Sequence, residues 1–193
     1  GHTPKSDMWT TVSSAKEDEK GNYAYGPGSQ DGDVYMPAEQ DAAIQSGANE
    51  GGFWYPGEKS KTVDELVSEY EDSVGHNSNY MLELSPDRKG HLPAGDVEAY
   101  TGFGQAIQRC YGEKGRGDVA RIDAVHCDAI ACQVSLSSSD SVVDRIRIRE
   151  SEHTRFVRKY NIFAATAKDG GEWTKVANGS SVGRCRIHRV APL

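Results

Sequence analysis

The spacing of apolar residues changes near Gly112, and this change constrains the fold more than any other feature of the sequence. Before Gly112 the spacing is helical, most clearly in residues 62–74, where Thr62 and Glu65 also form a Thr-x-x-Glu capping box. After Gly112 the period is two, as in residues 143–148, where apolar side chains alternate with arginines. A chain with both patterns is expected to build an α/β part followed by an all-β part.

The first part is predicted to alternate strands and helices. A short strand is expected at 33–36, a helix at 63–74 with Gly75 at its C-cap, and a strand at 80–84. Asp96 is expected to cap a second helix. One face of that helix would carry Val97, Tyr100, Ile107 and Tyr111. Strands that alternate with helices imply parallel pairing through crossover connections, so the residues indicate a piece of an α/β barrel.

The second part is predicted to be antiparallel. Residues 156–167 and 173–176 are expected to be strands joined by a turn at Asp169-Gly170-Gly171, and Cys185 and Ile187 alternate with polar neighbours in a further strand. The alternating arginines are expected to face solvent; they are Arg145, Arg147 and Arg149. No closing strand follows, which indicates an incomplete antiparallel β-sandwich.

Charge supports the same division. Residues 1–112 carry a large excess of acidic residues and residues 113–193 a smaller excess of basic ones, within a net charge of −7. This change of sign predicts two domains, 1–112 and 113–193, with a boundary between Gly112 and Val119. The acidic half argues against a nucleic-acid surface. The sequence contains no run of about 18 apolar residues, so no membrane-spanning helix is predicted.

The four cysteines leave two interpretations open. None forms a Cys-x-x-Cys pair, so no zinc site is indicated. Cys127 and Cys132 are close enough in sequence to bridge a short loop, or they are buried free thiols; Cys110 and Cys185 have no such neighbour. An even count and the sequon Asn178-Gly179-Ser180 fit a secreted or lysosomal protein weakly, although Asn-Gly is also ordinary turn chemistry.

Glu39 and Asp41 are candidate catalytic residues. They are expected on a loop that leaves the carboxyl end of the strand at 33–36, where parallel α/β barrels place their reactive groups. Two carboxylates at positions i and i+2 are suited to acid–base chemistry or to binding sugar hydroxyls. Surface acids are common, and ordinary solvated side chains are the alternative interpretation.

Aromatic residues follow in the same predicted loop. Phe53 and Trp54 stand in a Gly- and Pro-rich stretch, where aromatic faces are suited to stacking on a pyranose ring. His2 and Trp9 are further candidates for this substrate-binding group. A small packing cluster under a long loop is the alternative. The histidines show no metal spacing, and no phosphate loop or serine nucleophile motif is present, so no cofactor is indicated.

These motifs resemble glycoside hydrolase family 29, the α-L-fucosidases, in content and in order. In the first part the shared motifs are Pro37-Ala38-Glu39-x-Asp41, Phe53-Trp54-x-Pro56-Gly57-Glu58, Ser73-Val74-Gly75-His76-Asn77-Ser78-Asn79, Leu84-Ser85-Pro86-Asp87-Arg88-Lys89-Gly90, Leu92-Pro93 and Asp96-Val97. In the second part they are Val143-Asp144-Arg145-Ile146, Gly171-Glu172-Trp173 and Val182-Gly183-x-Cys185-Arg186-Ile187. The resemblance covers most of the chain.

The resemblance implies part of a (β/α)8-type barrel joined to an incomplete, galactose-binding-like sandwich. It implies a retaining glycosidase that releases terminal α-L-fucose from oligosaccharides or glycoproteins, without a cofactor. Gly52 departs from the family, which often has Trp there, and Met81 and Glu83 replace Leu and Asn. The family's nucleophile Asp and acid/base Glu are expected outside this chain, so this chain is expected to be inactive alone. A non-catalytic sugar-binding module and a degenerate homologue are the alternatives.

Overall fold

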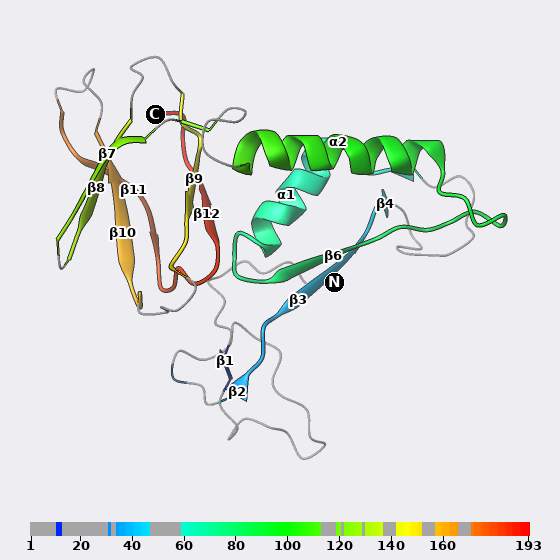
Figure 1. Cartoon of the computed structure of the whole chain (residues 1–193), viewed down its shortest axis with the longest axis horizontal. Coiled ribbons are helices and arrows are strands. Elements are labelled where there is room, and N and C mark those ends of the chain that lie inside the picture. The colour runs from blue at the N-terminus through cyan, green and yellow to red at the C-terminus, as the bar shows by residue number, and fades with distance from the viewer. Residues whose placement is uncertain are drawn as a thin grey trace.

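The computed structural model describes residues 11–12, 31, 34–46, 59–112, 119–120, 122–128, 130–136, 142–151, 157–165 and 171–193. Figure 1 shows an elongated molecule, with two helices and a parallel strand pair in one half and antiparallel strand pairs in the other. The carboxyl end of the longer helix meets the antiparallel half (Figure 1).

The first half is a strand–helix–strand–helix unit, as the sequence predicts. Its elements are β3 (Glu39–Ala43), α1 (Val63–Ser73), β6 (Asn79–Glu83) and α2 (Ala94–Tyr111). β3 and β6 pair in parallel, with Glu39 opposite Asn79 and Ala43 opposite Glu83, and α1 lies in the connection between them. Within the described residues this parallel sheet has two strands, so the structure shows an α/β unit and not a closed barrel.

The position of the first parallel strand differs from the prediction. The expected strand at 33–36 exists as β2 (Val34–Tyr35), but β2 pairs antiparallel with β1 (Thr11–Val12). The parallel strand begins four residues later in the chain than β2 ends, at Glu39, within the segment that was expected to be a loop. Pairing with β6 outweighs the low β-propensity of a Glu-Gln-Asp-Ala-Ala sequence.

The first helix follows the predicted capping box. Thr62 Oγ1 accepts a hydrogen bond from the Glu65 amide (3.2 Å), and Glu65 Oε2 accepts one from the Thr62 amide (2.7 Å). The C-cap is Val74 rather than Gly75. Glycine is needed at position 75 for another reason: a Cβ atom there would lie 2.2 Å from the Glu71 carbonyl oxygen and 2.8 Å from Ile187 Cβ.

The second helix begins earlier than predicted, and its predicted face is confirmed only in part: Ile107 and Tyr111 join the core, whereas Val97 and Tyr100 do not. Its N-cap is Pro93, without a side-chain cap, so Asp96 is not the cap. Val97 and Tyr100 are 46% and 51% exposed. The buried side of the helix carries two small residues, Ala99 and Ala106, which let α1 approach closely. A search of the sequence for large apolar side chains at helical spacing does not detect a buried face that is formed by alanines.

Two small clusters form the core. The first joins Ile44, Leu66 and Ala99, with Leu82, Leu84 and Phe103 packed against it, so it holds β3 and β6 against the helices. The second joins Tyr111 to Cys185 and Ile187, with Tyr70, Val74 and Ile107 around it. The second cluster therefore contains side chains from both halves of the molecule.

The second half consists of antiparallel pairs, as predicted. The strands are β7 (Ile122–Cys127), β8 (Cys132–Leu136), β9 (Arg145–Ile148), β10 (Tyr160–Ala164), β11 (Thr174–Gly179) and β12 (Arg186–Arg189). β7 pairs with β8, β10 with β11, and β12 with β9. No strand was predicted at β7 and β8, and the strand predicted at 156–167 is longer than β10.

A disulfide joins Cys127 and Cys132, which face each other across the β7–β8 pair. This observation decides between the two interpretations of these cysteines. Cys110 is a free, exposed thiol and Cys185 a free, buried thiol. Burial raises the pKa of the Cys185 thiol.

The predicted solvent face holds for Arg147 and Arg149, which are exposed, whereas Arg145 is half-buried beside α1. Arg145 Nε donates a hydrogen bond to Glu71 (2.9 Å), and Arg147 Nη1 donates one to the Tyr111 carbonyl oxygen (2.6 Å). The Arg147 guanidinium also lies 5.7 Å from the centre of the Tyr111 ring. Arg186, a polar residue that alternates with Cys185 and Ile187, is fully buried. The boundary between 112 and 119 stays a prediction.

Candidate functional site

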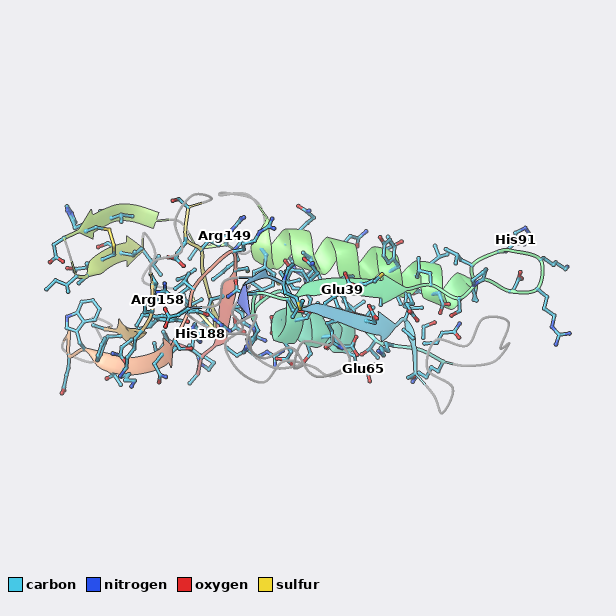
Figure 2. The ribbon with its side chains drawn as sticks, turned by 90° about the horizontal axis from the view of Figure 1, so that it is seen from below. Glu39, Glu65, His91, Arg149, Arg158 and His188 are labelled. Carbon is cyan, nitrogen blue, oxygen red and sulfur yellow. A yellow bond between two sulfur atoms is a disulfide. The ribbon has the colours of Figure 1, made fainter. Side chains whose placement is uncertain are left out.

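The β3–β6 pair has one covered face and one open face. Tyr80 and Leu82 of β6 point toward the helices, where Leu82 joins the first cluster and the Tyr80 ring packs against Phe103. On the open face lie the residues that alternate with them. Glu39, Asp41, Asn79, Met81 and Glu83 are exposed, whereas Ala43, opposite Glu83, is buried. Figure 2 labels Glu39 on β3, in the α/β half and away from His188 of β12.

The two candidate carboxylates lie on this open face. The structure places Glu39 and Asp41 within β3 and not on a loop, which corrects the predicted position. Their i, i+2 spacing does put both side chains on one side of the sheet. Glu39 is at the amino end of β3, and a strand rise of about 3.3 Å per residue separates it from Ala43 at the carboxyl end by about 13 Å. Of the two, Asp41 is nearer to the carboxyl edge.

A second strand pair stands at the carboxyl edge of β3. β4 (Gln45–Ser46) follows β3 after Ile44 and pairs antiparallel with β5 (Lys59–Ser60). The Ile44 amide donates to the Glu83 carbonyl oxygen (2.9 Å), and the Lys61 amide donates to the Ile44 carbonyl oxygen (2.8 Å). These bonds attach the β4–β5 pair to the parallel sheet.

Ser46 at the end of β4 and Lys59 at the start of β5, which flank segment 47–58, both lie at the carboxyl edge of β3. Reactive and binding groups of parallel α/β proteins gather at this edge. Phe53 and Trp54 belong to that segment, and they lie outside the described residues, as do His2 and Trp9. Their assignment to substrate binding stays a prediction.

Asp96 is a buried residue at this edge whose position the sequence analysis misjudged. Its side chain is fully buried and accepts hydrogen bonds from Gln45 Nε2 (2.8 Å) and Ser60 Oγ (2.6 Å). Both donors come from the β4–β5 pair. An Asp in the first turn of a helix suggests an N-cap, and no local pattern reveals partners 36 and 51 residues earlier in the chain.

A separate polar cluster joins the two halves. Glu71 of α1 accepts hydrogen bonds from the Tyr111 hydroxyl, Arg145 Nε and Arg189 Nε. Burial raises the pKa of Glu71, but these three bonds outweigh it and hold the pKa below its ordinary value. Burial and the bond to Glu71 raise the pKa of the Tyr111 hydroxyl.

A pocket of about 210 Å³ lies beside this cluster, lined by Glu71, Asp72, His76, Ile187, His188 and Arg189. Arg189 already pairs with both Glu71 and Asp72, so the carboxylates of the pocket are engaged within the protein. The pocket sits between α1 and β12, remote from the open face, and its groups serve the joint between the halves.

Two absences hold for the residues that the structure describes. They contain no group of three or more His, Cys, Asp or Glu side chains placed to hold a metal ion. None of the helices in these parts of the chain is long and apolar enough to cross a membrane.

Comparison with known proteins gives a consistent relationship. No protein-family model matches the chain. It is 26% identical over 196 residues to α-L-fucosidase 1 of Arabidopsis thaliana, an alignment that covers 83% of this chain and 37% of that protein. The chain thus spans well under half the length of this relative.

Solved structures share the fold over nearly the whole chain. A Bacteroides thetaiotaomicron protein with α-L-fucosidase in its name aligns with 99% of this chain and 43% of its own, at a TM-score of 0.78 and 24% identity. A family 29 fucosidase of Ruminococcus gnavus, solved in complex with fucose, aligns with 97% of this chain and 43% of its own, at a TM-score of 0.69 and 22% identity. In sequence the chain is similar to a part of the Arabidopsis thaliana α-L-fucosidase 1, and in fold it is similar to a part of these solved structures.

Proposed function

We propose that the longer protein to which this chain corresponds is a glycoside hydrolase that releases terminal α-L-fucose from oligosaccharides or glycoproteins. One observation carries the proposal: the alignment with the Arabidopsis thaliana α-L-fucosidase runs over 83% of the chain. The strand–helix–strand–helix unit would form part of a (β/α)8 barrel in that protein, and the antiparallel strands would form part of its sandwich.

The open face supports this function. In a closed barrel, the sheet face opposite the helices becomes the interior, and the carboxyl edge becomes the mouth. Glu39 and Asp41 would then point inward, with Asp41 nearer to the mouth, and segment 47–58 would begin and end there. We assign Asp41 and Glu39 to sugar binding or acid–base support, and Phe53 and Trp54 to the wall of the sugar site.

The proposed reaction is retaining hydrolysis. It requires two carboxyl groups about 5–5.5 Å apart, one as nucleophile and one that donates and then accepts a proton. By resemblance, both essential groups lie outside these 193 residues. This chain alone therefore supplies neither the reacting pair nor the strands that would hold it rigidly, and it is expected to hydrolyse no fucoside.

A paired assay tests the proposal. The 193-residue chain and the longer protein are incubated with a chromogenic α-L-fucoside, and the anomer first released is identified by proton NMR. We expect turnover with retention from the longer protein only. Turnover by the chain alone would mean that the reacting groups are within it, with Glu39 and Asp41 as the first candidates. A longer protein without turnover would favour a sugar-binding or degenerate homologue.

The role of Trp54 is tested by substitution in the longer protein. Trp54→Ala is expected to raise KM for a fucoside, because it removes a stacking surface for the sugar. Trp173→Ala is the matched control, since Trp173 is 55% exposed and lies in the antiparallel half. Equal kinetics for Trp54→Ala and the wild type would remove Trp54 from the site.

The disulfide supports a secreted or lysosomal location for the longer protein. Disulfides persist in oxidising surroundings such as the secretory pathway and the extracellular space. The Cys127–Cys132 bond therefore favours a secreted or lysosomal protein, which fractionation of cells that express the tagged longer protein would test.

A further inference from the structure

The sequon Asn178-Gly179-Ser180 lies in the antiparallel half and plays no part in the proposed reaction. It has the Asn-x-Ser pattern in which the Asn side chain accepts an N-linked oligosaccharide. None of the other asparagines in the chain has Ser or Thr two positions later. The chain therefore offers a single acceptor, and its position in the fold decides whether that acceptor can hold a glycan.

The structure excludes a turn at Asn178-Gly179. Both residues belong to β11, which pairs antiparallel with β10, and Asn178 lies opposite Asn161. The two-residue turn that Asn-Gly favours needs a positive φ at both positions. Neither Asn178 nor Gly179 has a positive φ. Turn chemistry, which the sequence left open as the alternative, does not explain these residues.

Asn178 points outward from the β10–β11 pair. Tyr160 of β10 marks the inward face, because its hydroxyl lies 2.8 Å from His188 Nε2 of β12. Gly179 is opposite Tyr160 on that face, and a Cβ at Gly179 would lie 2.7 Å from Cε1 of the Tyr160 ring. Side chains alternate along a strand, so Asn178 points away from β12. Ser180, which follows β11, is exposed as well.

The outward face around Asn178 is open to solvent. Asn178 and Asn161 are exposed, and Phe163 is 49% exposed, whereas Ile162 and Ala177 on the inward face are half-buried. In a β-sandwich, a second sheet packs on the inward face and further strands pair at the edges. Strands that complete the sandwich would therefore leave the outward face in solvent, with room for an oligosaccharide on Asn178.

The Cys127–Cys132 disulfide provides a second, independent observation. Disulfides form in the lumen of the endoplasmic reticulum. N-linked oligosaccharides are transferred to asparagine in the same lumen. The disulfide and the exposed sequon therefore point to the same compartment, although they belong to different strand pairs.

We propose that Asn178 carries an N-linked oligosaccharide in the longer protein. The proposal rests on the secreted or lysosomal location that the disulfide supports. In the transfer, Asn178 Nδ2 forms a bond to the anomeric carbon of an oligosaccharide that is carried on a polyprenyl diphosphate. The bond from that carbon to the diphosphate oxygen breaks, a base of the transferase takes one Nδ2 proton, and the polyprenyl diphosphate leaves.

Mass spectrometry of peptides from the longer protein, expressed in eukaryotic cells with its own leader, is the first test. The peptide that contains Asn178 is expected to carry hexose and N-acetylhexosamine. A peptide N-glycosidase in heavy-oxygen water should remove these sugars and leave a labelled aspartate in place of Asn178. A sample without the glycosidase is the control, because Asn-Gly sequences also deamidate spontaneously.

Variants test which atoms are required. Asn178→Gln and Ser180→Ala are each expected to abolish the glycan, whereas Ser180→Thr should retain it because it keeps the hydroxyl group. Asn161→Gln is the matched control, since Asn161 is exposed directly opposite Asn178 but has Phe163 two positions later. It should leave the glycan unchanged. Sugars that persist on this peptide in Ser180→Ala would overturn the proposal, because they would be attached elsewhere.

A second arm adds a known signal peptide to the longer protein and separates the compartment from the fold. A bare Asn178 in the protein with its own leader overturns the proposal. A glycan in the second arm only would place the error in the location, and a bare Asn178 in both arms would place it in the accessibility of β11.

Fucosidase kinetics keep this proposal distinct from the proposed function. Asn178→Gln is expected to leave kcat and KM unchanged, because Asn178 lies in the antiparallel half and the open face of β3 and β6 in the other. Activity with a bare Asn178 would leave the proposed function intact, and a glycan on an inactive protein would refute that function alone.

Discussion

Glu71 is the residue on which the two halves of the molecule converge. Its carboxylate is 4% exposed and accepts hydrogen bonds from Tyr111 of α2, Arg145 of β9 and Arg189 of β12. All of these partners belong to the framework, and they lie away from the open face. Glu71 is therefore assigned to stability rather than to substrate binding.

Replacing Glu71 by Gln is expected to lower the free energy of unfolding of the chain by about 2 kcal/mol, because hydrogen bonds from charged donors are among the stronger ones. Urea denaturation followed by circular dichroism measures the effect. Asp144→Asn is the control: Asp144 also pairs with Arg145 (3.2 Å) but is 59% exposed, so its loss should cost about 0.5 kcal/mol or less. Equal losses for the two variants would contradict the burial argument.

The stabilisation by Glu71 is expected to depend on pH. Because its pKa is below the ordinary 4.5 in the folded chain, the unfolded chain takes up the proton first as the pH falls. The contribution is complete above about pH 4.5 and is lost as the pH falls through the folded pKa. Unfolding of wild type and Glu71→Gln between about pH 3 and pH 7 measures this. A stability difference that stays constant with pH would refute the assignment.

At the scale of single residues, the sequence could not identify this cluster. Arg145 and Arg147 alternate with apolar residues, and alone this pattern indicates a solvent-facing side of a strand. Their partners are Glu71 and Tyr111, and Arg145 lies 74 residues from Glu71 in the chain. Such long-range partners leave no local signal. The i, i+2 spacing puts Glu39 and Asp41 on a shared face because the segment is a strand, whereas the sequence predicted a loop there.

Elements were predictable where the local signal is strong. The capping box and helical spacing gave α1 correctly, since both are properties of consecutive residues. β3 was misplaced because its residues are poor strand formers, and it exists through pairing with β6. The buried face of α2 was predicted correctly at Ile107 and Tyr111 but not near its amino end, because close contact with α1 selects alanine and glycine rather than large apolar side chains.

A pair of glycine variants in α2 tests this contact between helices. A Cβ at Gly102 would lie 2.7 Å from Val63 Cγ2, whereas a Cβ at Gly104 would meet nothing within 4 Å. Gly104→Ala is expected to stabilise the chain by about 1 kcal/mol through helix propensity. Gly102→Ala gains the same propensity but must displace α1, so it is expected to destabilise by about 1 kcal/mol. Thermal melts compare the two, and equal stabilisation would exclude the close contact.

At the scale of the whole molecule, the joint between the halves is extensive. The Ile187 amide donates to the Gly75 carbonyl oxygen (3.0 Å), directly linking β12 to the end of α1. Asn77, which has a positive φ of 65°, accepts from the Cys185 amide (3.1 Å) and donates to the Val182 carbonyl oxygen (3.0 Å). The sequence predicted two domains from charge and periodicity, and neither signal reports how firmly two units are joined.

Because the two halves share these contacts, we expect them to unfold together. Ile187 is 4% exposed in the cluster with Tyr111 and Cys185, so neither half buries this surface without the other. Ile187→Ala is expected to destabilise the chain by about 3 kcal/mol and to lower both of two unfolding midpoints equally. One midpoint is measured by far-UV circular dichroism, which reports on the helices. The other is measured by tryptophan fluorescence in a Trp9→Phe, Trp54→Phe background, in which Trp173 alone reports on the antiparallel half. Two separated transitions, with only the fluorescence midpoint moved by Ile187→Ala, would show that the halves are independent and that the joint contributes little.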